Sequence, residues 1–202
     1  MSNILKSASN NLLSNIKPIE VKTFTIKIED IKKAMITENT WLAEGRKEDG
    51  RVMKELFTDL DEIISDCLYW YETENEEIAK QMVRDLNEFK ESNKKYRKRN
   101  KEKYRSVPAY GKYTDTDSKV LYVGTVKGRV RKSDDLTTIA SRTFQHLGFY
   151  EKGSTGALHL WYWAKHSVKL NVIELTGQKE EYRNVFEKLL AIELKPLIGV
   201  HR

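Results

Sequence analysis

The chain has 202 residues and a mass of 23.6 kDa, a length that suits one domain or a compact domain with an appendage. Its single cysteine, Cys67, excludes a disulfide framework and a multi-cysteine zinc site. The net charge of +6 combines −6 over residues 1–89, +7 over 90–105 and +5 over 106–202. The basic second part therefore favours a polyanionic partner. Long apolar stretches and an apolar leader are lacking, so we expect a cytoplasmic protein with no membrane partner.

The first 105 residues are predicted to form a mainly helical region after one short strand. Loose alternation of apolar residues predicts the strand within 21–30, and Asp30 is a candidate cap for a helix that follows. Apolar residues then recur every three or four positions over 51–68, which predicts a helix of more than four turns. The same helical spacing of apolar residues resumes over 78–89. We expect an antiparallel helical hairpin or a small bundle.

A basic segment, residues 90–105, is predicted to prolong the second helix and to link it to the rest of the chain. Charge runs of this kind are usually solvated helix faces. Here the run leads directly into a second domain, so contact with phosphates is the favoured interpretation, without base readout. The candidate nucleic-acid-binding residues in this segment are Lys94, Lys95, Arg97, Lys98 and Arg99.

Residues 106–202 are predicted to form a compact α+β domain, a small mixed or antiparallel sheet flanked by helices. The pattern predicts a β-hairpin, a helix closed by Gly148, two further strands and a last helix ended by Pro196. In chain order the predicted segments are a hairpin of 107–113 with 119–126, a helix from Asp134 or Asp135 to 147, strands at 157–164 and 168–175, and a helix over 178–195.

Four polar residues of this domain fall where secondary structure lets them converge. Tyr122 ends a predicted strand, and Arg142 and His146 are four residues apart, so they share one helix face. Glu187 lies on the last predicted helix. Each residue alone is most simply a rim or surface residue.

Their order and spacing change this interpretation. The string YVG at 122–124, the pattern R-x-x-x-H at 142–146 and a glutamate nine residues before Pro196 together resemble the GIY-YIG nuclease family. The resemblance covers about residues 107–200. It implies a small sheet flanked by helices that carries one active site for phosphodiester hydrolysis.

The resemblance also implies a role for each matching residue. Glu187 matches the glutamate that binds a divalent metal, and a hard carboxylate suits Mg²⁺ or Mn²⁺. Arg142 matches the arginine that holds a phosphate and offsets developing charge. His146 matches a histidine that accepts a proton from a tyrosine or water. Tyr122 matches a tyrosine that positions the attacking water or, with a lowered pKa, acts as a base.

The sequence departs from the family pattern in three places. No GIY string is present; Tyr110 or Tyr113 can supply the first tyrosine, and we favour Tyr110, which a hairpin would set opposite Tyr122. Gly199 stands where many relatives have an asparagine. An insertion at 125–141 adds cations that form either a solvated loop or a contact with a DNA backbone: Lys127, Arg129, Arg131 and Lys132.

We therefore expect a divalent-metal-dependent DNA endonuclease acting on double-stranded DNA, of a restriction or mobile-element type. Two active sites are needed to cut two strands together, so we expect either a homodimer or sequential nicking of the two strands. One alternative is an inactive nucleic-acid-binding module on the same fold, which the altered first motif favours. Another is an interaction protein that acts through its N-terminal helices.

Overall fold

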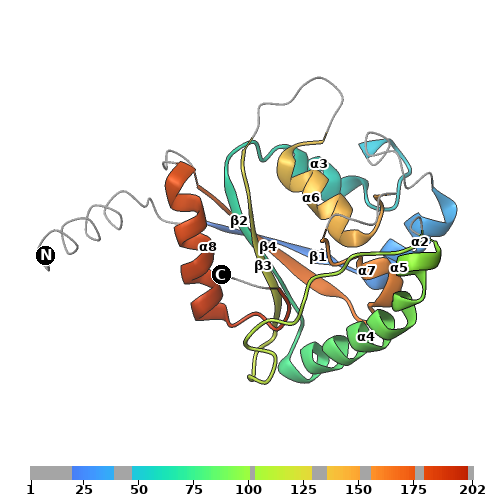
Figure 1. Ribbon diagram of the computed structural model, residues 1–202. Coiled ribbons are helices and arrows are strands. Elements are labelled where there is room, and N and C mark those ends of the chain that lie inside the picture. Colours follow the sequence, from blue (N-terminus) through green and yellow to red (C-terminus); the bar gives the residue numbers. More distant parts are fainter. Residues whose placement is uncertain are drawn as a thin grey trace, which may run out of the picture.

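The computed structural model describes residues 20–38, 47–100, 103–128, 136–150, 156–175 and 180–199, without the side chains of 98, 99, 180 and 181. The fold is α+β: helices cover both faces of a four-stranded antiparallel sheet (Figure 1). In these parts of the chain, every helix is too short or too polar to cross a membrane.

The sheet takes strands from both halves of the chain. Its strands are β1 (Val21–Ile26), β2 (Cys67–Glu72), β3 (Val120–Val126) and β4 (Val168–Glu174), in the order β1-β4-β2-β3, and all neighbours are antiparallel. Two strands thus precede the predicted boundary near residue 105 and two follow it. Strand β2, from the first half of the chain, lies between β4 and β3 and is hydrogen-bonded to both of these strands from the second half. The two halves therefore share one sheet.

The first strand and helix agree with the prediction made from the sequence, except that the predicted helix cap is wrong. β1 lies within the predicted segment 21–30, and the next helix, α2 (Ile28–Thr37), starts two residues before Asp30. Asp30 therefore lies in the first turn, where a negative charge still interacts favourably with the helix dipole, and it is not the cap. Lys27 occupies the cap position without a side-chain hydrogen bond.

The long helix predicted over 51–68 is wrong in its second half. Helix α3 (Lys54–Asp61) covers only eight residues, and β2 follows it. Along β2, Tyr69 and Tyr71 belong to the main core, whereas Leu68 and Trp70 pack with residues of the last helix on the other face. A strand covered on both faces is apolar throughout, and such a run cannot be told from a buried helix by periodicity. Residues 54–94 therefore form a helix, a strand and a second helix, and the described part of the first half contains neither the expected helical hairpin nor a small helical bundle.

The apolar residues spaced helically over 78–89 do form a helix, α4 (Glu76–Lys94). A single helical turn, α5 (Tyr96–Arg99), follows it. The Asn75 side chain caps α4 by accepting a hydrogen bond of 2.9 Å from the backbone N–H of Ile78. The helix predicted through the basic segment is thus confirmed as far as residue 99, with a break at Lys95.

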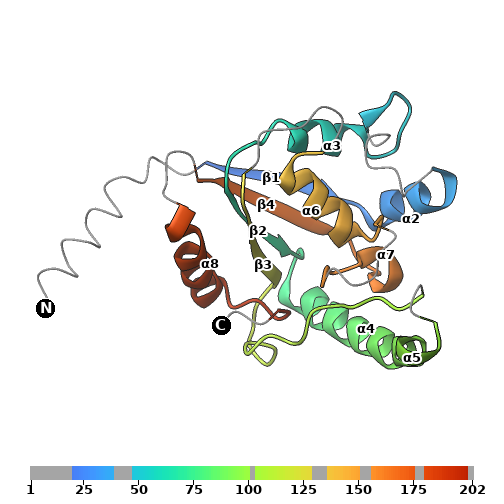
Figure 2. The ribbon, with the colours of Figure 1, turned by 45° about the horizontal axis from the view of Figure 1, so that its top comes forward.

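Helices divide between the two faces of the sheet (Figures 1 and 2). Helix α8 (Glu180–Leu194) covers one face, and α6 (Thr138–Leu147) lies on the other with α3. Helix α6 ends as predicted at Gly148, whose φ of 100° is the left-handed conformation that glycine adopts without a steric penalty.

Two strands predicted in the second half are wrong. Residues 107–113 make only one bridge, between Tyr110 and Ile198, and β3 pairs with β2 where the hairpin was predicted. Residues 157–164 contain a single helical turn, α7 (Leu160–Trp163), which follows His159 in a left-handed backbone conformation. Local sequence did not reveal the pairing of β3, because its partner, β2, lies about fifty residues earlier in the chain.

Candidate active site

Tyr69 is at the centre of a polar cluster beneath helix α6. Its ring is only 1% exposed, because β2 is the strand next to β3 and points Tyr69 towards the main core. The hydroxyl lies 2.9 Å from Nε2 of His146 and 3.3 Å from Nε of Arg142, which donates to it. Both residues of the R-x-x-x-H pattern therefore meet one phenol oxygen.

Arg142 and His146 reach Tyr69 because they occupy one face of α6, as their spacing predicts. His146 is fully buried, and its Nδ1 accepts a hydrogen bond of 3.1 Å from the backbone N–H of Leu158. Arg142 is half-buried and donates from Nη1 to the Gln145 side chain at 2.9 Å. Its guanidinium also lies within hydrogen-bonding reach of the Tyr122 phenol.

Two more tyrosines complete the cluster. Tyr122 of β3 pairs with Tyr71 of β2, and both rings lie beside the imidazole of His146, at centroid distances of 5.0 and 5.2 Å. Tyr71 is fully buried, whereas Tyr122 is partly exposed. Tyr122 and Arg142 are therefore the members of the cluster that a molecule from solvent meets first.

Gly124 makes room for this arrangement. It lies directly opposite Tyr69 in the β2–β3 pairing. A Cβ atom at this position would lie 2.5 Å from the Tyr69 hydroxyl and 2.9 Å from a ring carbon of Tyr122. Any side chain would push the phenols out of place, so the glycine of the YVG string is a packing requirement here.

Burial sets the protonation of the cluster. Burial first, and then the positive charge of Arg142, holds the pKa of His146 well below its ordinary value, so the imidazole is neutral at neutral pH. Burial raises the pKa of both Tyr69 and Tyr71, which keeps these phenols protonated. His159, also buried, has its pKa lowered to about 4, mainly by burial.

Tyr110, the predicted first tyrosine of the motif, lies outside this cluster. It is 38% exposed, it is bridged to Ile198, and the Lys90 ammonium lies 3.7 Å above its ring. Tyr113, the other candidate, lies in a turn, and the ammonium nitrogen of Lys112 lies 4.8 Å from the centre of its ring. The structure therefore brings Tyr122, Arg142 and His146 together, but with tyrosines of β2.

Tyr69 and Tyr71 are the cluster residues that the sequence interpretation missed. The run Leu68-Tyr69-Trp70-Tyr71 is rich in residues that favour strands, and a polar segment follows it. That composition was the available signal. The helical spacing of the preceding residues concealed it.

Glu187, the predicted metal ligand, lies half-buried on α8, which covers the other face of the sheet from α6. One turn later on the same helix, Ala191 packs with Val120 and Val123 of β3, the strand that carries Tyr122. Among the residues that the structure describes, no three His, Cys, Asp or Glu side chains gather to hold a metal ion.

The predicted cations lie in several different settings. Lys94 pairs with Glu91 at 2.6 Å, Lys95 lies 5.0 Å from the ring centre of Tyr96, and Arg97 is exposed. Lys127 is exposed at the end of β3. The side chains of Lys98 and Arg99, and residues Arg129, Arg131 and Lys132, lie outside the described part of the chain.

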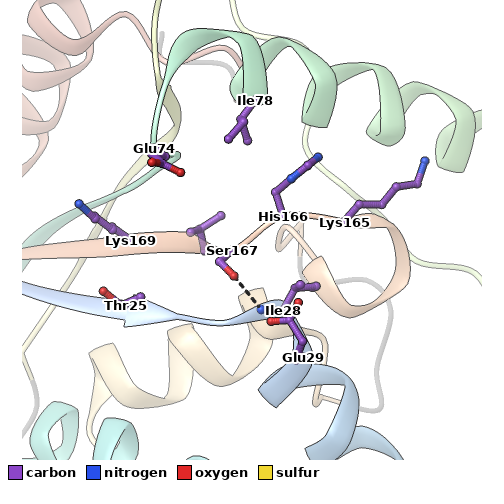
Figure 3. A pocket seen from close by; sticks show the side chains of 10 residues that line it. Thr25, Ile28, Glu29, Glu74, Ile78, Lys165, His166, Ser167 and Lys169 are labelled. Atoms are coloured by element: carbon purple, nitrogen blue, oxygen red, sulfur yellow. Dashed lines mark hydrogen bonds between the residues drawn. The ribbon is translucent and has the colours of Figure 1, made fainter.

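A separate cavity of about 480 Å³ opens between the ends of β1, β4 and α4 (Figure 3). Its lining mixes charges of both signs, from the acidic residues Glu29 and Glu74 and the basic residues Lys165 and Lys169. Lys165 already pairs with buried Asp85 at 2.7 Å. None of the cluster residues lines this cavity, so it is not part of the candidate active site.

Comparison of the chain with protein-family models, with curated proteins and with solved structures finds no match. The functional interpretation therefore depends on the cluster itself and on the resemblance of its residues to the GIY-YIG motifs.

Proposed function

We propose that this protein is an endonuclease that hydrolyses phosphodiester bonds in DNA. Its active site would be the Tyr69 cluster, which consists of Tyr69, Tyr71, Tyr122, Arg142 and His146. One observation carries the proposal: Arg142 and His146 both hydrogen-bond the same tyrosine hydroxyl, beside Tyr122. A solvated helix face would not bury an arginine and a histidine against phenols. The order of strand tyrosine, strand tyrosine, helix Arg and helix His supports the family resemblance, with Tyr69 in the role first given to Tyr110.

The residues divide the proposed reaction between them. Arg142 binds the scissile phosphate and offsets the charge that grows on its oxygens. Tyr122, the partly exposed phenol, orients the attacking water. A bond forms between the water oxygen and phosphorus, and the bond from phosphorus to the leaving oxygen breaks. The attacking water loses a proton to solvent, and the leaving oxygen takes one up from solvent, so the step balances.

The family resemblance gives the metal to Glu187 alone. Mg²⁺ keeps several waters and is commonly held by one or two carboxylates together with substrate phosphates, so a single carboxylate is enough for this cation. Because α8 and α6 cover opposite faces of the sheet, however, Glu187 does not fit a metal that shares a phosphate with Arg142, and no step of the proposed reaction depends on a metal.

The basic end of α4 and α5 is the proposed path for the DNA backbone. Lys95 and Arg97 are exposed, and they form no ion pair with any residue that the structure describes. Lysine and arginine on phosphates give affinity without sequence readout, and the affinity falls as salt rises.

The test is cleavage of supercoiled plasmid with Mg²⁺ or Mn²⁺. Wild type is compared with Arg142→Ala and Glu187→Gln, and Lys188→Ala, an exposed neighbour on α8, is the matched control. We expect cutting by wild type and by the control, and a loss of at least about 100-fold in Arg142→Ala. Unchanged cutting by Arg142→Ala would remove this site from consideration, and unchanged cutting by Glu187→Gln would exclude Glu187 as a metal ligand.

A nucleic-acid-binding protein that does not cut is the second candidate, and the burial of the cluster favours it. Tyr69, Tyr71 and His146 are 0–1% exposed, which leaves only Tyr122 and Arg142 for a substrate. This candidate predicts salt-sensitive DNA binding and no cutting with either metal. Cutting that Arg142→Ala abolishes would exclude it.

A further inference from the structure

The hydrogen bonds of His146 determine which of its ring nitrogens carries the proton. A backbone N–H can only donate, so Nδ1 of His146, 3.1 Å from the backbone nitrogen of Leu158, must accept and carries no proton. A neutral imidazole has one donor and one acceptor nitrogen. Nε2 is therefore the N–H donor, and it faces the Tyr69 hydroxyl at 2.9 Å.

The groups around His146 favour the neutral ring. Tyr69 and Tyr71 approach it from β2 and Tyr122 from β3, while Arg142 lies on its own helix. Burial opposes a positive charge on the ring most, and the guanidinium of Arg142 opposes it next; His159, which precedes α7, adds to this only when it is itself protonated. Among the residues that the structure describes, no carboxylate hydrogen-bonds either ring nitrogen.

The Tyr69 oxygen is then approached by two donors. Nε2–H of His146 and Nε–H of Arg142 both point at it, and a guanidinium can only donate. The lone pairs of the phenol are thereby used. Its remaining hydrogen-bonding capacity is its own O–H, which is directed at neither His146 nor Arg142.

We propose that His146 is a positioning residue that donates from Nε2–H to Tyr69, held in this tautomer by the backbone N–H of Leu158, and that Tyr69 serves the site as an O–H donor. The catalytic part of this inference rests on the proposed nuclease function; the tautomer does not. The role differs from the proton acceptor that the sequence predicted, because the nitrogen that faces Tyr69 already carries a proton.

Nitrogen NMR on ¹⁵N-histidine-labelled protein tests the tautomer without any activity. The chain has four histidines, and the signals of His146 are identified by their loss in His146→Gln. At pH 7 we expect a protonated Nε2 and an unprotonated Nδ1. A protonated Nδ1, or a doubly protonated ring, would overturn the proposal whether or not the protein cuts DNA.

A pair of variants tests the role. The amide of His146→Gln can offer an N–H near the position of Nε2 but cannot act as a base, whereas His146→Ala offers neither. If His146 is a donor, Gln keeps plasmid cleavage within about tenfold of wild type, and Ala loses about 100-fold. Equal loss in Gln and Ala, with both variants folded by circular dichroism, would contradict a donor role. Absence of cleavage in wild type would count against the nuclease function, and the NMR result would still decide the tautomer.

Discussion

The Tyr69 hydroxyl lies 2.9 Å from Nε2 of His146, although 77 residues separate the two in the chain. The contact exists because β2 pairs with β3 and α6 packs over both. It joins a strand that carried no predicted function to the helix that carried the predicted arginine and histidine.

Replacing one tyrosine at a time by phenylalanine tests whether Tyr69 or Tyr110 acts as the first tyrosine of the motif. Tyr69→Phe removes the oxygen that Arg142 and His146 contact, whereas Tyr110→Phe changes an exposed ring outside the cluster. We expect plasmid cleavage to fall about 100-fold in Tyr69→Phe and to stay within about twofold in Tyr110→Phe. The reverse order would support the assignment made from the sequence.

Substitution of Gly124 should disturb the cluster from the strand side. In Gly124→Ala the new methyl group would meet the Tyr69 hydroxyl at 2.5 Å, so one or both phenols must move. Overpacking of this kind costs about 1–3 kcal/mol of unfolding free energy, measured by urea denaturation.

The control for this variant is Gly50→Asn. Nothing lies within 4 Å of a Cβ atom at Gly50, and asparagine tolerates its left-handed backbone, with a φ of 79°. We expect a loss smaller than that of Gly124→Ala. Equal stability of Gly124→Ala and wild type would mean that the two rings do not pack as described.

Stability should fall as pH drops from about 6.5 towards 4. The unfolded chain protonates its histidines near pH 6.5, whereas His159 in the native protein protonates only at about pH 4. Between these values the unfolded state binds more protons, so lower pH favours unfolding, by about 2–3 kcal/mol for this residue at pH 4.5. His146, whose pKa is also lowered, adds to the loss.

The variant His159→Asn isolates this contribution. Asparagine tolerates the left-handed backbone at this position, where φ is 55°, and it does not titrate. Urea denaturation at pH 7.5 and pH 4.5 should show a smaller pH dependence in the variant than in wild type. Identical pH dependence in the two proteins would argue against a neutral buried His159.

Cys67 should be unreactive in the native protein. Its side chain is fully buried at the start of β2, and burial is the main cause that raises the pKa of its thiol to about 12. Because the thiolate is the reactive form, we expect maleimide to label Cys67 only as fast as the protein unfolds. Rapid labelling under native conditions, at the rate of a free thiol, would contradict this burial.

Several parts of the molecule followed from the sequence alone, because local chemistry specifies them. Alternation predicted β1, the helix with Arg142 ends at Gly148 as expected, and the last helix stops before Pro196. The spacing of Arg142 and His146 placed both on one helix face, whatever lay beneath it. A period of 3.6 residues needs no information from distant residues.

Only the tertiary structure decided what that helix face meets. Residues 67–72 form a strand since both of their faces are covered, and this burial depends on α8 and α6, which come much later in the chain. The same pairing brings Tyr69 to His146 and leaves Tyr110 beside Ile198. Pairing between strands far apart in sequence follows from the burial that the whole chain achieves, so no local pattern predicted which tyrosine would meet the histidine.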